Sequence, residues 1–125
     1  QVVLGAPHID TTSFRRSLAP PLTGAARRVT IYASQNDRAL AMAERASSYP
    51  RVGQAGPGLL VLPDLDVIDA SAAEQGDFGH GYLGASNAVL ADLRAVLAGV
   101  PAAARRLERR QRGGLAYWEL LGEAR

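Results

Sequence analysis

The chain has 125 residues, of which 47% are hydrophobic, with no cysteine and a formal net charge of +2. This composition fits one folded domain and excludes a disordered chain, a disulfide framework and a thiolate metal site. The small net charge does not favour a nucleic-acid partner. The longest apolar runs, residues 1–6 and 58–63, are far shorter than the roughly 18 residues that cross a bilayer, so no membrane span is predicted. A cytoplasmic and an exported location both stay open.

Strand and helix patterns alternate along the first 97 residues. The predicted strands are short runs rich in β-branched residues, which is typical of parallel strands buried on both faces. In chain order we expect a strand at 2–4, a helix from Thr11 or Thr12 to Leu18 that Pro20 and Pro21 end, a strand at 28–34, a helix at 39–46, a strand at 66–70 and a helix at 86–97. This order predicts a three-layer α/β fold in which helices flank a mainly parallel sheet.

The last quarter of the chain is expected to be helical. Five of the eight residues at 105–112 are arginine and only Glu108 offsets them, so we predict an arginine-rich helix at 102–111. Charge runs of this kind are usually solvated faces, and contact with an anionic membrane surface is the less favoured role. The apolar segment 115–121 is expected to dock onto the domain or onto a partner. We therefore divide the chain into an α/β part, 1–100, and a helical tail, 101–125.

The carboxyl ends of the predicted strands hold the residues that could carry chemistry. Ligands of open parallel sheets collect at this edge, and Asp10, Asp37 and His80 are expected there. An acid followed by a histidine is the order of acid and base in α/β-hydrolase triads, where the carboxylate fixes the imidazole tautomer and stabilises the imidazolium. Each residue also has an ordinary structural role, as a helix cap or an exposed loop histidine. We predict Asp37 as the acid and His80 as the base.

No serine in the sequence has the setting of a triad nucleophile. A nucleophile elbow is a Gly-x-Ser-x-Gly turn after a strand, and no such pentapeptide occurs here. Ser86 follows no predicted strand, and we expect it to be a helix N-cap. Ser34 ends a strand, but no glycine follows it at the required spacing. Because the strand pattern begins almost at Gln1, we expect the chain to be part of a longer enzyme whose preceding half carries the serine.

Several motifs resemble a known family. Over nearly all of residues 1–97, the following motifs resemble, in order, the C-terminal half of an uncharacterised bacterial family of α/β-hydrolases: Val3-Leu4-Gly5-Ala6-Pro7-His8-Ile9-Asp10, Tyr32-Ala33-Ser34-Gln35-Asn36-Asp37-Arg38-Ala39-Leu40, Gly53-Gln54-Ala55, Ile68-Asp69 and Gly79-His80-Gly81-Tyr82. The resemblance implies an esterase- or lipase-like fold, with the acid at Asp37 and the base at His80. Asp10 is the alternative acid, because some hydrolases place that residue one strand earlier.

Two functions of different classes follow from these observations. The first is the C-terminal portion of a serine hydrolase acting on a small-molecule ester or related acyl bond, in which His80 deprotonates a serine outside this chain. The alternative is a non-catalytic α/β module that pairs with a second copy, or completes another chain, through an unpaired strand edge at Val2 or Val29. The sequence predicts no cofactor and no metal, since it has no glycine-rich phosphate loop and His8 and His80 lack metal-ligand spacing.

Overall fold

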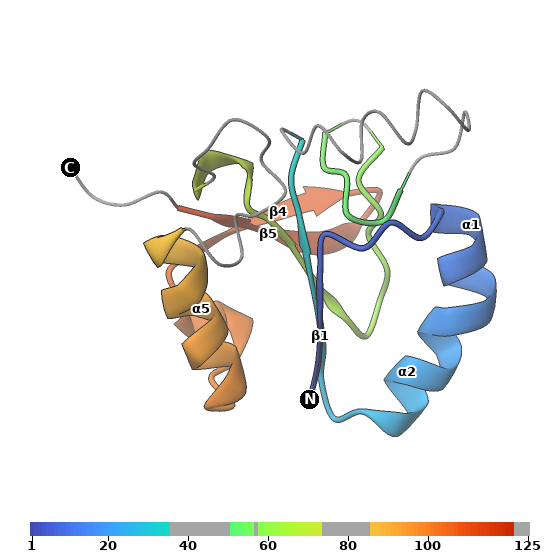
Figure 1. Ribbon diagram of the computed structural model, residues 1–125, viewed down its shortest axis with the longest axis horizontal. Helices are drawn as coiled ribbons and strands as arrows, with labels where there is room; N and C mark the ends of the chain where they lie inside the picture. The colour runs from blue at the N-terminus through green and yellow to red at the C-terminus, as the bar shows by residue number, and fades with distance from the viewer. Residues whose placement is uncertain (36–50, 57, 74–85, 122–125) are drawn as a thin grey trace.

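A mixed β-sheet forms the centre of the molecule in the computed structural model, which describes residues 1–35, 51–56, 58–73 and 86–121 (Figure 1). Within these residues the sheet has five strands in the order β1-β2-β3-β5-β4. Strands β1, β2, β3 and β5 are parallel, and β4 pairs antiparallel with β5. The strands are β1 (Val2–Gly5), β2 (Val29–Ala33), β3 (Asp66–Asp69), β4 (Leu107–Arg112) and β5 (Leu115–Leu120). The predicted α/β class and its first three strands are confirmed.

Helices cover both faces of the sheet and make the three predicted layers (Figure 1). On one face a short helix α1 (Thr11–Ser13) continues through a π-helical turn (Phe14–Leu18) into α2 (Ala19–Ala25). The other face carries α5 (Asn87–Leu97), as predicted. The predicted helix at 39–46 lies outside the described residues. No helix in the described ranges has the length and apolar character needed to cross a bilayer.

The expectation that Pro20 and Pro21 end the first helix is wrong. Both prolines lie in the first turn of α2, which continues to Ala25. A proline inside a helix removes a backbone donor, and the wider π-helical turn directly before α2 accommodates the two rings without ending the helix.

Strand β2 divides the hydrophobic core into two halves. Val29, Ile31 and Ala33 pack with Phe14 on the α2 face, whereas Tyr32 packs on the α5 face. All five residues of β2 are buried. This burial on both faces is why β2 has the clearest strand pattern in the sequence.

The predicted arginine-rich helix is wrong, because its residues form the edge of the sheet. After a 3₁₀ turn (Ala102–Ala104), β4 and β5 make a hairpin around Gly113 and Gly114, whose φ angles are +58° and +78°. Two successive positive φ values suit the twist of a two-residue hairpin loop. The charged side chains of β4 are exposed, which is a common way to protect an edge strand from further pairing. Residues 101–125 therefore include two strands of the same sheet rather than a helical tail.

The expected unpaired edge at Val29 is also wrong. Strand β2 lies between β1 and β3, with Val29 opposite Val2 and Ile31 opposite Val67. The three strands pair in chain order, which places β2 inside the sheet. Among the described strands, β1 and β4 occupy the two ends of the order.

Candidate functional site

The carboxyl ends of β2, β3 and β5 meet at one edge of the sheet. Ala33 lies opposite Asp69, and Asp69 lies opposite Glu119. Just beyond the strands, the backbone N–H of Gln35 donates to Ser71 Oγ at 2.9 Å, and Ser71 Oγ donates to Asp69 Oδ1 at 2.5 Å. The backbone N–H of Ser71 donates to the same carboxylate oxygen at 2.9 Å. These three bonds connect the segment that follows β2 to the segment that follows β3.

A cavity of about 290 Å³ lies at this connection, which we call the strand-edge cavity. Its lining consists of Gln35, Asp69, Ser71, Ala72 and Glu119. Two carboxylates and a side-chain amide give it hydrogen-bonding groups, and its position is where open parallel sheets bind ligands. Asp69, Ser71 and Glu119 are not among the site residues predicted from the sequence. The available signal was Asp69 itself, an acid at a strand end with a serine two residues later, which is the spacing of a local side-chain to backbone turn.

The predicted acid and base both lie outside the described residues. In the sequence, Asp37 comes two residues after Gln35, and His80 comes nine residues after Ser71. The structure therefore describes the two strand ends that precede Asp37 and His80. It brings those strand ends together as neighbours in one parallel pair.

Asp10, the alternative acid, caps helix α1. Its Oδ1 accepts the backbone N–H of Ser13 at 2.9 Å, and the residue has extended backbone geometry, as an N-cap requires. The pKa of the Asp10 carboxyl lies below its ordinary value. The largest cause is the hydrogen bond from the backbone N–H of Ser13, followed by the bond from the Ser13 side chain, and the nearby Arg51 guanidinium adds to the effect. Asp10 follows β1, and β2 separates β1 from β3 in the sheet.

The lowered pKa of Asp10 makes its contribution to stability dependent on pH. A carboxyl whose pKa is lower in the folded chain stabilises the fold above its ordinary pKa, and this contribution is lost as the pH falls through the folded value. We expect wild type to exceed Asp10→Asn in unfolding free energy at pH 7, and the gap to be narrower at pH 3, which lies below the ordinary carboxyl pKa of 3.8. Asp10→Ala, which removes the cap altogether, should be less stable than Asp10→Asn at both pH values. Urea denaturation at the two pH values measures this, and a pH-independent gap between wild type and Asp10→Asn would contradict it.

The described serines near strand and helix ends have structural roles. Ser86 is the N-cap of α5, where its Oγ accepts the backbone N–H of Val89 at 3.3 Å, so the predicted cap is confirmed. Ser34 is fully buried after β2, and its N–H donates to the carbonyl of Gly53 at 3.0 Å. Within the part of the chain that the structure describes, no group of three or more His, Asp or Glu side chains could hold a metal ion.

Comparison with known protein families gives a match over most of the chain. No curated protein and no solved structure matches the chain significantly. A family model described as alpha/beta hydrolase of unknown function matches residues 1–97, which include β1, β2, β3 and α5. The match covers most of the chain and agrees with the motif resemblance and with the mainly parallel sheet. The chain belongs to this family, the alpha/beta hydrolases of unknown function (DUF900).

Proposed function

We propose that this chain carries the acid and the base of a serine hydrolase that cleaves an ester or a related acyl bond. The acid is Asp37 and the base is His80. The observation that supports the proposal most is the parallel pairing of β2 and β3, with Ala33 opposite Asp69, because the segments that contain Asp37 and His80 follow these two neighbouring strand ends. Family membership supports the same reaction class.

The proposed chemistry divides the triad between this chain and a serine outside it. Asp37 accepts a hydrogen bond from Nδ1–H of His80, so that Nε2 is free to take the proton from the serine hydroxyl. The serine Oγ then bonds to the acyl carbon, the ester C–O bond breaks, and the proton on Nε2 passes to the leaving alcohol. Water, activated by the same histidine, releases the carboxylic acid and restores the serine.

The hydrogen bonds at the strand-edge cavity support this arrangement. Asp69 and Ser71 hold the backbone of Gln35, which precedes Asp37 by two residues, against the start of the segment that leads to His80. A triad needs its acid and base held in a fixed relative position, because small displacements reduce catalysis strongly. The connection between the two segments is the kind of support that such a pair requires.

A fluorophosphonate probe, which reacts with activated serines, tests the proposal. We expect the 125-residue chain to stay unlabelled and a protein in which this chain follows a serine-bearing segment to be labelled. In that longer protein, His80→Ala should abolish labelling and ester hydrolysis, and Asp37→Asn should weaken both.

Asp10→Asn is the matched control, since Asp10 is an acid at the end of the neighbouring strand and caps a helix. It should retain labelling. If Asp10→Asn loses labelling and Asp37→Asn retains it, the triad acid is Asp10 rather than Asp37. A labelled serine within these 125 residues, or hydrolysis that survives His80→Ala, would contradict the proposal.

A second candidate is a non-catalytic module that associates through β1. This strand lies at one end of the described sheet, and a partner strand could pair with it. Gel filtration with light scattering should then show a dimer at micromolar concentrations. A monomer across that range, together with serine-dependent hydrolysis in the longer protein, would reject this candidate.

A further inference from the structure

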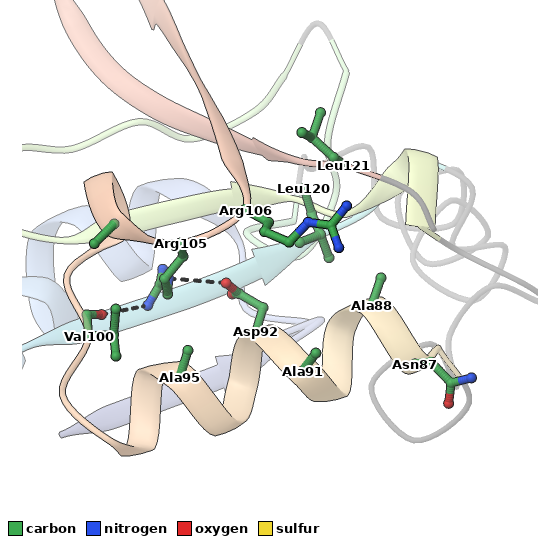
Figure 2. Close-up of a pocket in the computed structure, with 11 residues that line it drawn as sticks. Asn87, Ala88, Ala91, Asp92, Ala95, Val100, Arg105, Arg106, Leu120 and Leu121 are labelled. Atoms are coloured by element: carbon green, nitrogen blue, oxygen red, sulfur yellow. Dashed lines mark hydrogen bonds and ion pairs between the residues drawn. The ribbon is translucent and has the colours of Figure 1, made fainter. Parts of the chain in front are cut away.

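A second and larger cavity, the α5 cavity, lies between α5 and the segment that enters β4 (Figure 2). Its volume is about 390 Å³, and among the described residues it shares no lining residue with the strand-edge cavity. Small or apolar side chains form most of its wall, including Ala88, Ala91, Ala95, Val100 and Leu120. Binding sites for small molecules typically combine such a wall with a few polar groups.

The polar part of the wall is a buried ion pair. Arg105 Nε lies 3.0 Å from Asp92 Oδ1, and the two side chains are 1% and 3% exposed; Figure 2 shows them pointing toward one another. The other carboxylate oxygen, Asp92 Oδ2, accepts the hydroxyl proton of Tyr32 at 2.6 Å. Arg105 Nη1 donates to the carbonyl of Val100 at 3.4 Å, whereas Nη2 is buried and has no hydrogen-bond acceptor among the described residues. Such a buried donor calls for an acceptor, because an unsatisfied one is costly.

Arg106 adds a second cationic group to the same cavity. It lines the cavity next to Arg105, it is exposed, and it forms no ion pair with any residue in the described ranges. Two arginines and one aspartate therefore line the cavity and leave one positive charge in excess. This excess suits a ligand with a single negative charge.

We propose that the α5 cavity binds a small carboxylate with an apolar body. The carboxylate accepts hydrogen bonds from the exposed Arg106 guanidinium, which binds planar carboxylates well, and from Arg105 Nη2 once that buried group turns toward the cavity. The apolar body packs against the alanines of α5 and against Leu120. Because a water molecule occupies about 30 Å³ of liquid volume, the cavity has room for roughly a dozen non-hydrogen atoms. The site does not depend on the assignment of Asp37 and His80.

Titration of the isotopically labelled protein with octanoate, followed by NMR, tests this site. We expect saturable binding with a Kd of about 0.1–1 mM, in the range for a ligand of some ten non-hydrogen atoms. The shifted resonances should belong to residues 87–95 and 100–106. Octan-1-ol, which has the same chain length without the charge, should bind at least about tenfold more weakly.

Three variants complete the test. Arg106→Gln should weaken octanoate binding about tenfold, since it removes one charged donor, and Ala91→Leu should weaken binding because its three added carbon atoms take up part of the cavity. Arg94→Gln is the control, because Arg94 is an exposed arginine of the same helix outside the cavity wall. Each variant is first checked for a native spectrum. No saturable shift in folded wild type, equal binding of octan-1-ol, or shifts elsewhere in the molecule would overturn the proposal.

Discussion

Asp92→Ala is expected to lower the free energy of unfolding by about 3–5 kcal/mol, because it leaves a buried guanidinium without its counter-charge. The Arg105 side chain is 1% exposed, so the folded chain offers this guanidinium little contact with solvent. The hydrogen bond from the Tyr32 hydroxyl to Asp92 is lost in the same variant. The 3.0 Å contact between Arg105 and Asp92 lacks hydrogen-bond alignment, so the charge pairing rather than a linear hydrogen bond is what the variant removes. Urea denaturation at neutral pH measures the loss.

An exposed ion pair of the same chain is the control. Arg110 contacts Glu108 and Glu119 at 3.3 and 3.2 Å, but its side chain is 44% exposed, and Arg110→Ala should cost no more than about 1 kcal/mol.

A second comparison tests the origin of the effect. Changing Asp92, Arg105 and Tyr32 together to Leu, Met and Phe should recover most of the loss, since buried ion pairs often exchange for apolar groups at little cost. A cost for Asp92→Ala as small as that for Arg110→Ala would show that the buried pair does not contribute as described.

Gly53→Ala is expected to destabilise the fold by about 2–4 kcal/mol. A Cβ at this position would lie 2.5 Å from the carbonyl carbon of Ala6 and 2.7 Å from the nitrogen of Pro7. These are backbone atoms, and Gly53 also bonds to both neighbouring segments: its N–H donates to Pro7 at 2.9 Å and its carbonyl accepts from Ser34 at 3.0 Å. The backbone cannot move away without breaking those bonds at the carboxyl ends of β1 and β2.

Gly24→Ala is the matched substitution. Gly24 lies in α2, and no atom approaches within 4 Å of the position its Cβ would take. Alanine there should raise the free energy of unfolding by about 0.5–1 kcal/mol, because it restricts the unfolded chain and favours the helix. Thermal unfolding of both variants should give shifts of opposite sign, and a Gly53→Ala protein as stable as wild type would contradict the close approach.

Local sequence patterns predict those elements whose structure depends on residues close together in the chain. The strand at β2, the helix α5 and its Ser86 cap follow from side-chain periodicity and capping chemistry within a few residues. The β4–β5 hairpin does not follow from the local pattern, because its arginines also fit an exposed helix. Strand structure is favoured there only by the pairing of β5 with β3, which lies about 50 residues earlier in the chain. The Gly113-Gly114 pair between two short runs was the one local signal for it.

By itself, the sequence determined the α/β class, the family and the order along the chain of the residues proposed as acid and base, because each of these depends on residue types and spacing. Only the tertiary structure decided which strand ends are neighbours, how Asp69 and Ser71 connect them, and that Asp92 meets both Arg105 and Tyr32 in the interior. Tyr32 and Asp92 are 60 residues apart in the chain. Contacts over such separations are made by packing helices onto a sheet, and no local pattern encodes which side chains then meet.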